Sequence, residues 1–178
     1  LTGYNTDAEG LYRYLRHMKV DITNKDILII GAGGASFPIT VFFARCSPKS
    51  IAVQNRTQSK ADELAEYVYH DSEFKIETEN FKKRYDVVIN TTSAGMYPDM
   101  SKCPIDDFSE IDESVTAVDL IYNPTETLFL KKSKEKGAKT INGLGMLIYQ
   151  GLLAYELFTG VTITENIYDR VEKEVFGK

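Results

Sequence analysis

The feature that most constrains this 178-residue chain is a glycine cluster that lies between a predicted strand and a predicted helix. Asp26–Ile30 is a short apolar run that stops at a glycine, as expected of a central parallel strand buried on both faces. From Phe37 to Cys46 the apolar residues recur at helical spacing, and Pro38 is tolerated because it falls in the first turn. A strand, a glycine turn and a helix in this order open many nucleotide-binding α/β folds.

The rest of the chain continues the alternation of strands and helices. Ser50–Val53 is predicted as a second strand, and Ser59 as the N-cap of the helix that follows it. Further elements are predicted as strands over Tyr85–Asn90, Ala117–Leu120 and Lys139–Ile141, with a helix over Thr127–Lys136. The alternation predicts a doubly wound parallel sheet flanked by helices, which is a Rossmann-type α/β fold.

Amphipathic helices are predicted at both ends of the chain, over Thr6–Met18, Met146–Phe158 and Ile163–Phe176. Residues 19–143 are therefore predicted to form the nucleotide-binding domain. Residues 1–18 and 144–178 are predicted to link to, or pack on, a second domain, and an exposed apolar face on these helices is expected. The alternative is that the terminal helices simply cover the faces of the sheet.

Composition excludes several classes of partner. The formal net charge is −5 and the sequence shows no basic patch, which argues against nucleic acid and anionic membranes. Cys46 and Cys103 lie far apart without C-x-x-C spacing, so neither a disulfide scaffold nor a metal site is predicted. No apolar run approaches the roughly 20 residues needed to span a bilayer, and the first residues do not resemble a signal peptide. A cytoplasmic location is expected.

The glycine cluster predicts a site for a diphosphate. Gly31-Ala32-Gly33-Gly34-Ala35 matches the G-x-G-x-x-[GA] pattern except that Ser36 takes its last position. Such glycines allow a tight turn and let backbone N–H groups approach a pyrophosphate at a helix N-terminus. We therefore predict that residues 31–35 bind a dinucleotide, the alternative being an ordinary tight turn.

The end of the second strand favours NADP over NAD. A carboxylate at this place would bind the ribose 2′-hydroxyl of NAD, and none is present. Instead Asn55, Arg56 and Thr57 follow the strand, with Lys60 one turn later. A guanidinium beside a hydroxyl and an ammonium suits a 2′-phosphate. The alternative is that Arg56 and Lys60 are ordinary solvated charges.

Six motifs in order resemble those of the shikimate dehydrogenase family, over nearly the whole chain. They are Asn5-Thr6-Asp7, Gly31-Ala32-Gly33-Gly34-Ala35, Asn55-Arg56-Thr57 with Lys60, Asn90-Thr91-Thr92-Ser93-Ala94-Gly95-Met96, Asp119-Leu120-Ile121-Tyr122 with Pro124 and Thr127, and Gly143-Leu144-Gly145-Met146-Leu147 ending at Gln150. Their order and spacing are far more specific than the glycine loop, which many unrelated dehydrogenases share.

The resemblance implies reversible reduction of 3-dehydroshikimate to shikimate by NADPH, in a cleft between an N-terminal domain and the domain seen here. In this family a lysine of the N-terminal domain pairs with the aspartate that matches Asp7, and no lysine of this chain takes that role. The serines and the asparagine that bind substrate from the N-terminal domain are likewise unmatched. We therefore expect a fragment that is inactive alone and that partners the N-terminal domain of its own protein; a homodimer is left open.

The resemblance also assigns individual roles. Asp7 is implied in catalysis and substrate binding, although its place before an apolar helical face is equally that of an N-cap. Tyr122 and Gln150 are implied in substrate binding. The alternative for Tyr122 is packing, and for Gln150, on an apolar stripe, it is a backbone partner in the absent domain.

Cofactor contacts are implied for Thr92, Ser93, Leu120, Gly143 and Met146. The alternatives are a satisfied polar turn for the first two residues and core packing for Met146. His17 and His70 have no evident partner in the sequence and receive no role. Two competing functions are a binding module that senses NADP without chemistry and a relative that uses quinate with NAD or NADP.

Overall fold

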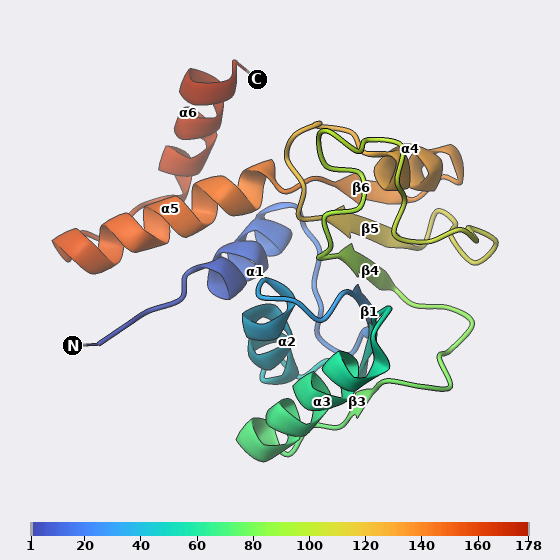
Figure 1. Cartoon of the computed structure of the whole chain (residues 1–178). Coiled ribbons are helices and arrows are strands. Elements are labelled where there is room, and N and C mark those ends of the chain that lie inside the picture. The colour runs from blue at the N-terminus through green and yellow to red at the C-terminus, as the bar shows by residue number, and fades with distance from the viewer. Residues whose placement is uncertain (1, 178) are drawn as a thin grey trace.

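A six-stranded parallel sheet forms the centre of the molecule. The computed structural model describes residues 2–177, apart from the side chains of residues 165, 166, 175 and 176. The strands follow the order β3-β2-β1-β4-β5-β6 (Figure 1). Their bounds are β1 Asp26–Ile30, β2 Ser50–Gln54, β3 Ile76–Glu77, β4 Val87–Asn90, β5 Thr116–Asp119 and β6 Lys139–Ile141. This order confirms the predicted doubly wound sheet. It reverses between β1 and β4, where ligands bind beyond the carboxyl ends of the strands.

Helices cover both faces of the sheet. Their bounds are α1 Asp7–His17, α2 Ser36–Ala44, α3 Gln58–Ser72, α4 Leu128–Glu135, α5 Leu144–Thr159 and α6 Glu165–Phe176. Every predicted helix is confirmed with small shifts of its ends. Two details of the sequence interpretation are corrected: the sequence does not predict the short edge strand β3, and Ser59 is not an N-cap, because α3 begins at Gln58 after Thr57.

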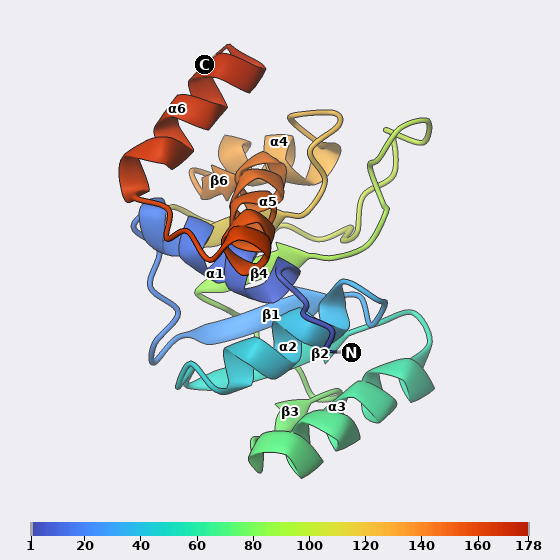
Figure 2. The ribbon, with the colours of Figure 1, turned by 90° about the vertical axis from the view of Figure 1, so that its left-hand side faces the viewer.

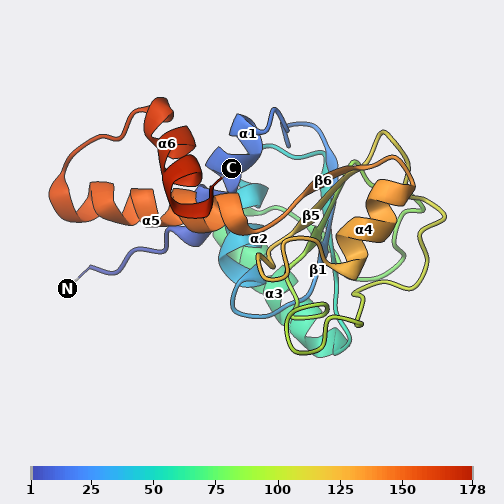
Figure 3. The same cartoon turned by 90° about the horizontal axis from the view of Figure 1, so that it is seen from above.

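The two faces of β1 show how the layers form. Ile27 and Ile29 are buried among residues of α1, α2 and α3, whereas Ile30 is buried on the opposite face with residues of α4. Successive side chains of a strand point to opposite faces, so a continuous apolar run is what a doubly covered strand requires. Figure 3 shows α4 on one side of the sheet and α1, α2 and α5 on the other.

Helices α1 and α5 cross at very short range. A Cβ on Gly145 would lie 2.1 Å from two ring atoms of Tyr14, and a Cβ on Gly10 would lie 2.8 Å from the backbone nitrogen of Gln150. Burial, with the charge of Glu172 added, raises the pKa of Tyr14 to about 12, so its hydroxyl stays protonated. The crossing requires glycine because neither helix leaves room for a larger side chain.

Helix α6 closes over this crossing. The ring of Tyr168 stacks on that of Tyr149 with 3.7 Å between centroids. His17, which has no evident partner in the sequence, lies 3.5 Å from the carboxylate of Asp169 on α6. His70 likewise lies 3.8 Å from Glu66, one turn earlier on α3. Both histidines therefore have acidic neighbours, although neither lies near the glycine loop.

The predicted exposed apolar face is confirmed on one of the three terminal helices. Helix α5 extends away from the sheet (Figures 1 and 3) and is seen nearly end-on in Figure 2. Tyr155, Leu157 and Phe158 on it are at least half exposed, Phe158 to 90%. The exposed side chains on α1 are charged or polar, so the prediction is wrong for that helix. The exposed side chains described on α6 are charged, and the apolar residues Val175 and Phe176 lie outside the described side chains. No helix among residues 2–177 is long and apolar enough to cross a membrane.

Candidate functional site

The turn after β1 needs a glycine at its first position. Gly31 has a φ of +111°, and a Cβ there would lie 2.6 Å from the hydroxyl of Thr91. Its amide donates a hydrogen bond to the carbonyl of Gln54 at 2.8 Å, which joins the turn to the end of β2. Residues with side chains rarely adopt this φ, so both the backbone and the close neighbour demand glycine.

Ser36, the departure from the glycine pattern, stabilises the turn. Its side chain is fully buried, and its hydroxyl donates a 2.7 Å hydrogen bond to the carbonyl of Gly31. Gly33 and Gly34 are exposed, with no neighbouring atom near where a Cβ would stand. The first turn of α2 carries no acidic residue. The positive N-terminus of α2 is therefore open to an anion.

Asn55 links the glycine turn to the end of β2. Its side-chain oxygen accepts a hydrogen bond from the amide of Ala32 at 3.2 Å, and its side-chain nitrogen donates to the carbonyl of Thr57 at 2.8 Å. Asn55 thus stabilises the turn from within the chain, and Thr57, at the start of α3, accepts one of its hydrogen bonds through the backbone carbonyl.

A groove of about 960 Å³ joins the turn to the exposed cations. Gly31, Ala32 and Gly33 line it together with Asn55, Arg56 and Lys60, and residues 91–94 and 96–99 complete the wall. Within residues 2–177 no ion pair forms at Arg56 or Lys60, whereas Lys102, farther along the groove, is paired with Asp99. The structure thus brings Asn55, Arg56 and Lys60, which follow the second strand, to the glycine turn, whereas Thr57 is not part of this lining.

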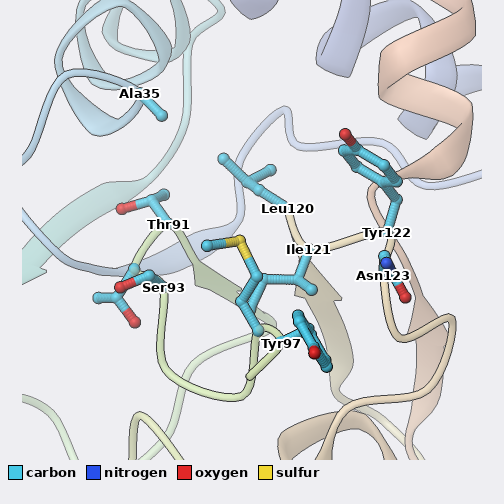
Figure 4. A pocket seen from close by; sticks show the side chains of 10 residues that line it. Ala35, Thr91, Ser93, Tyr97, Leu120, Ile121, Tyr122 and Asn123 are labelled. Carbon is cyan, nitrogen blue, oxygen red and sulfur yellow. The ribbon is translucent and has the colours of Figure 1, made fainter. Parts of the chain in front are cut away.

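A second pocket, of about 410 Å³, adjoins this groove at the ends of β4 and β5. Ala35, Thr91 and Ser93 lie on one side of it, Tyr122 and Asn123 on the other, with Leu120 between them (Figure 4). Thr92 contributes to both the groove and this pocket. Its lining combines apolar surface with hydroxyl groups, as small-molecule sites do. Tyr122 lines this pocket and is half exposed.

Beneath the pocket lies a buried polar network to which the sequence interpretation gives no role. Asn90 and Asp119 are register partners on β4 and β5, and the Asn90 amide donates to the Asp119 carboxylate at 3.0 Å. The hydroxyl of Thr127 and the backbone N–H of Ile121 also donate to this carboxylate, at 2.6 and 3.0 Å. Burial raises the pKa of Asp119 to about 6, against the effect of these three donors. The sequence signal for this network is that two apolar strands each end in a polar residue, Asn90 and Asp119.

Asp7 is the first residue of α1, and Gln150 lies where α5 crosses that helix. The hydroxyl of Thr6, beside Asp7, donates to the side-chain oxygen of Gln150 at 3.4 Å, and the Gln150 nitrogen donates to the carbonyl of Leu147 at 3.0 Å. Gln150 thus has polar partners within the chain and does not require one from another domain, and substrate binding by Gln150 stays a prediction. Asp7 is not an N-cap: it is the first residue of α1, and its amide donates to the side chain of Asn5 at 3.0 Å.

Gly143 and Met146 stand at the start of α5. A Cβ on Gly143 would lie 1.9 Å from the carbonyl oxygen of Leu120, so this glycine lets α5 approach the pocket wall. Met146, on α5, is half-buried and packs against the core cluster that includes residues of α1 and α5. Neither residue is part of the lining described above. Among residues 2–177 no cluster of His, Cys, Asp or Glu could hold a metal ion.

Comparison with known proteins gives concordant matches. Residues 14–120 match the family model described as Shikimate / quinate 5-dehydrogenase, and residues 143–163 match Shikimate 5′-dehydrogenase C-terminal domain. A shikimate dehydrogenase (NADP(+)) of Caldanaerobacter subterraneus subsp. tengcongensis is 38% identical over 182 residues, which covers 98% of this chain and 64% of the relative. The chain spans about three fifths of the length of the curated relatives it matches.

Solved structures are similar over the same extent. A crystal structure of a shikimate dehydrogenase in complex with NADP+ superposes with a TM-score of 0.82 and 36% identity, covering 94% of this chain and 60% of that one. The shikimate 5-dehydrogenase of Thermus thermophilus, in complex with NADP(H) and shikimate, gives a TM-score of 0.80 and 32% identity, covering 97% and 63%.

Proposed function

The chain belongs to the shikimate / quinate 5-dehydrogenase family, and we propose that it is the NADP-binding part of an enzyme that reversibly reduces 3-dehydroshikimate to shikimate. The observation that carries the proposal is the groove that connects the open N-terminus of α2 to the unpaired cations Arg56 and Lys60. Curated relatives are named shikimate dehydrogenase (NADP(+)), and one structural relative holds NADP(H) and shikimate together.

Each part of the groove suits one part of the nucleotide. The N–H groups of residues 32–35 face the diphosphate at the helix N-terminus, and Arg56, with Lys60 and Thr57, binds the 2′-phosphate. The smaller pocket receives the nicotinamide between Thr92, Ser93 and Leu120, with Gly143 and Met146 behind it. When bound, NADPH supplies the hydride, and the protein's residues bind and orient the two reactants.

Substrate would lie on the α5 side of the pocket, next to the hydroxyl of Tyr122 and toward Asp7 on α1 and Gln150 on α5. Hydride transfer leaves an alkoxide-like oxygen that must gain a proton, so a charged pair near it is needed. Asp7 contributes one member, and we propose that a lysine of a separate N-terminal domain contributes the other. The exposed apolar side chains of α5 support such a partner domain. Two free cysteines fit a cytoplasmic location.

Replacement of Arg56 tests the cofactor preference. We expect the chain to bind NADPH more tightly than NADH, and Arg56→Ala to remove most of that difference by weakening NADPH binding roughly tenfold or more, because a charge-assisted phosphate contact is lost. Isothermal titration calorimetry with both nucleotides measures this. Arg16→Ala, which removes an exposed arginine of α1 that lies outside the groove, is the matched control and should leave both affinities unchanged. Equal affinities of the wild type would defeat the NADP assignment.

Turnover tests the division of the site between two domains. We expect negligible shikimate oxidation by the purified chain, because no lysine is among the residues that line the smaller pocket. The assay follows NADPH absorbance at saturating shikimate and NADP+. Robust turnover would show that the chain holds a complete site. Binding of NADPH without turnover, even with the N-terminal domain added, would favour the NADP-sensing module, and turnover of quinate with NAD would favour the quinate enzyme.

A further inference from the structure

The two loops that form the nicotinamide pocket are joined beneath the surface by a single pair of side chains. Residues 91–97 follow β4, and residues 120–123 follow β5. Asn90 and Asp119 are the last residues of these strands, both are fully buried, and their side chains are joined by the 3.0 Å hydrogen bond described above. Both loops therefore start from one buried contact.

Each member of the pair binds its own loop. The Asn90 side-chain oxygen accepts hydrogen bonds from the backbone N–H and the hydroxyl of Thr92, at 3.0 and 2.7 Å. The Asp119 carboxylate accepts the backbone N–H of Ile121 and the hydroxyl of Thr127, and that hydroxyl in turn accepts the backbone N–H of Leu130, capping α4. Both oxygens of Asp119 are thus engaged, one by a pocket residue and one by the helix behind it.

The network is costly for the fold. Asp119 is the one acidic residue among the fully buried side chains described, and its donors are an amide, a hydroxyl and a backbone N–H rather than a cation. A buried carboxylate without a cation is less favourable for stability than apolar packing of the same volume. The network fixes the geometry of the pocket, because it binds Thr92 and Ile121, and both residues line the pocket.

Given the cofactor site proposed above, we infer that Asp119 is a positioning residue for the nicotinamide half of the cofactor. It holds the loops after β4 and β5 at the separation that the ring requires. It has no effect on the adenosine half, which binds along α2 and the end of β2. Removing its second acceptor oxygen leaves the N–H of Ile121 or the hydroxyl of Thr127 without a partner, and the loops separate or shift.

The test compares two ligands on one variant. Adenosine 2′,5′-bisphosphate carries the 2′-phosphate and no nicotinamide, so it reports the adenosine half alone, whereas NADPH reports both halves. By calorimetry, Asp119→Asn should bind NADPH roughly tenfold more weakly and the bisphosphate within about twofold of the wild type. A role in stability alone would not change the ratio of the two affinities.

Asp26→Asn is the matched control. Asp26 is also a hydrogen-bonded carboxylate in the sheet, held by Lys49, Ser50 and Lys82, but it lies at the opposite end of β1 and outside both pockets. It should lower stability without changing either affinity. If circular dichroism shows that Asp119→Asn does not fold, Thr127→Val, which removes one donor to the same carboxylate, takes its place with the same expected ratio.

The outcomes separate the two proposals. Wild-type protein that binds neither ligand overturns the proposed function. If the wild type binds both ligands, two results for the variant overturn the role of Asp119: full NADPH affinity, or an equal loss of both affinities. Either result leaves the proposed cofactor site intact.

Discussion

Gly143→Ala should be among the most damaging single substitutions in this chain. The added Cβ would lie 1.9 Å from the carbonyl oxygen of Leu120 and 2.4 Å from its carbon, and these are backbone atoms that cannot rotate away. We expect a loss of unfolding free energy on the order of 3 kcal/mol, measured by urea denaturation. Because Leu120 lines the smaller pocket, the variant should also bind NADPH more weakly.

Gly151→Ala provides the contrasting control on the same helix. Gly151 is exposed, and no atom lies within 4 Å of where its Cβ would stand. Alanine should therefore raise stability by roughly 1 kcal/mol, since it is the better helix former. If Gly143→Ala were as stable as the wild type, the close approach of α5 to the Leu120 carbonyl would be wrong.

Asp119 should give the protein a distinct pH dependence of stability. Its pKa is raised to about 6 in the folded chain, against about 3.9 for an unperturbed aspartate. Because the folded pKa is the higher one, the stability it contributes is fully present below about pH 4 and is lost as the pH rises through 6. The difference in unfolding free energy between wild type and Asp119→Asn should therefore fall by about 3 kcal/mol between pH 4 and pH 8.

Urea unfolding at several pH values, with wild type and Asp119→Asn in parallel, measures this difference and cancels the contributions of other groups. The thiol of Cys103 is the titratable neighbour that interacts with Asp119, and burial raises its pKa, so it stays neutral over this range. A difference that is constant with pH, or that grows as the pH rises, would contradict a buried carboxyl with a raised pKa.

Much of the fold could be predicted because local pattern and tertiary environment agree. The strand over Asp26–Ile30 is predicted with its observed bounds, since a strand covered on both faces has to be apolar throughout. The strand over Lys139–Ile141 is also predicted with its observed bounds, because it lies between two clear helical patterns. The glycine turn could be predicted because its backbone needs a positive φ at Gly31, and glycine is the residue type that adopts such a φ readily.

What could not be predicted depends on contacts between distant segments. The edge strand over Ile76–Glu77 has two half-buried residues, so no apolar run marks it. The donors around Asp119 come from β4, the loop after β5 and the N-cap of α4, and only the folded register brings them together. The sequence predicts that the polar partner of Gln150 is substrate or another domain, because the pattern of its own helix cannot show that Thr6 lies beside it.

The bonds of Ser36 and Asn55 have a consequence for binding kinetics. Both are made within the chain, to Gly31 and Ala32, so the glycine turn proposed to bind the diphosphate has its shape without a nucleotide. Little conformational entropy is then lost when the complex forms. Variants that keep this turn should differ in how long the nucleotide stays bound, while the rate at which it is captured remains nearly constant.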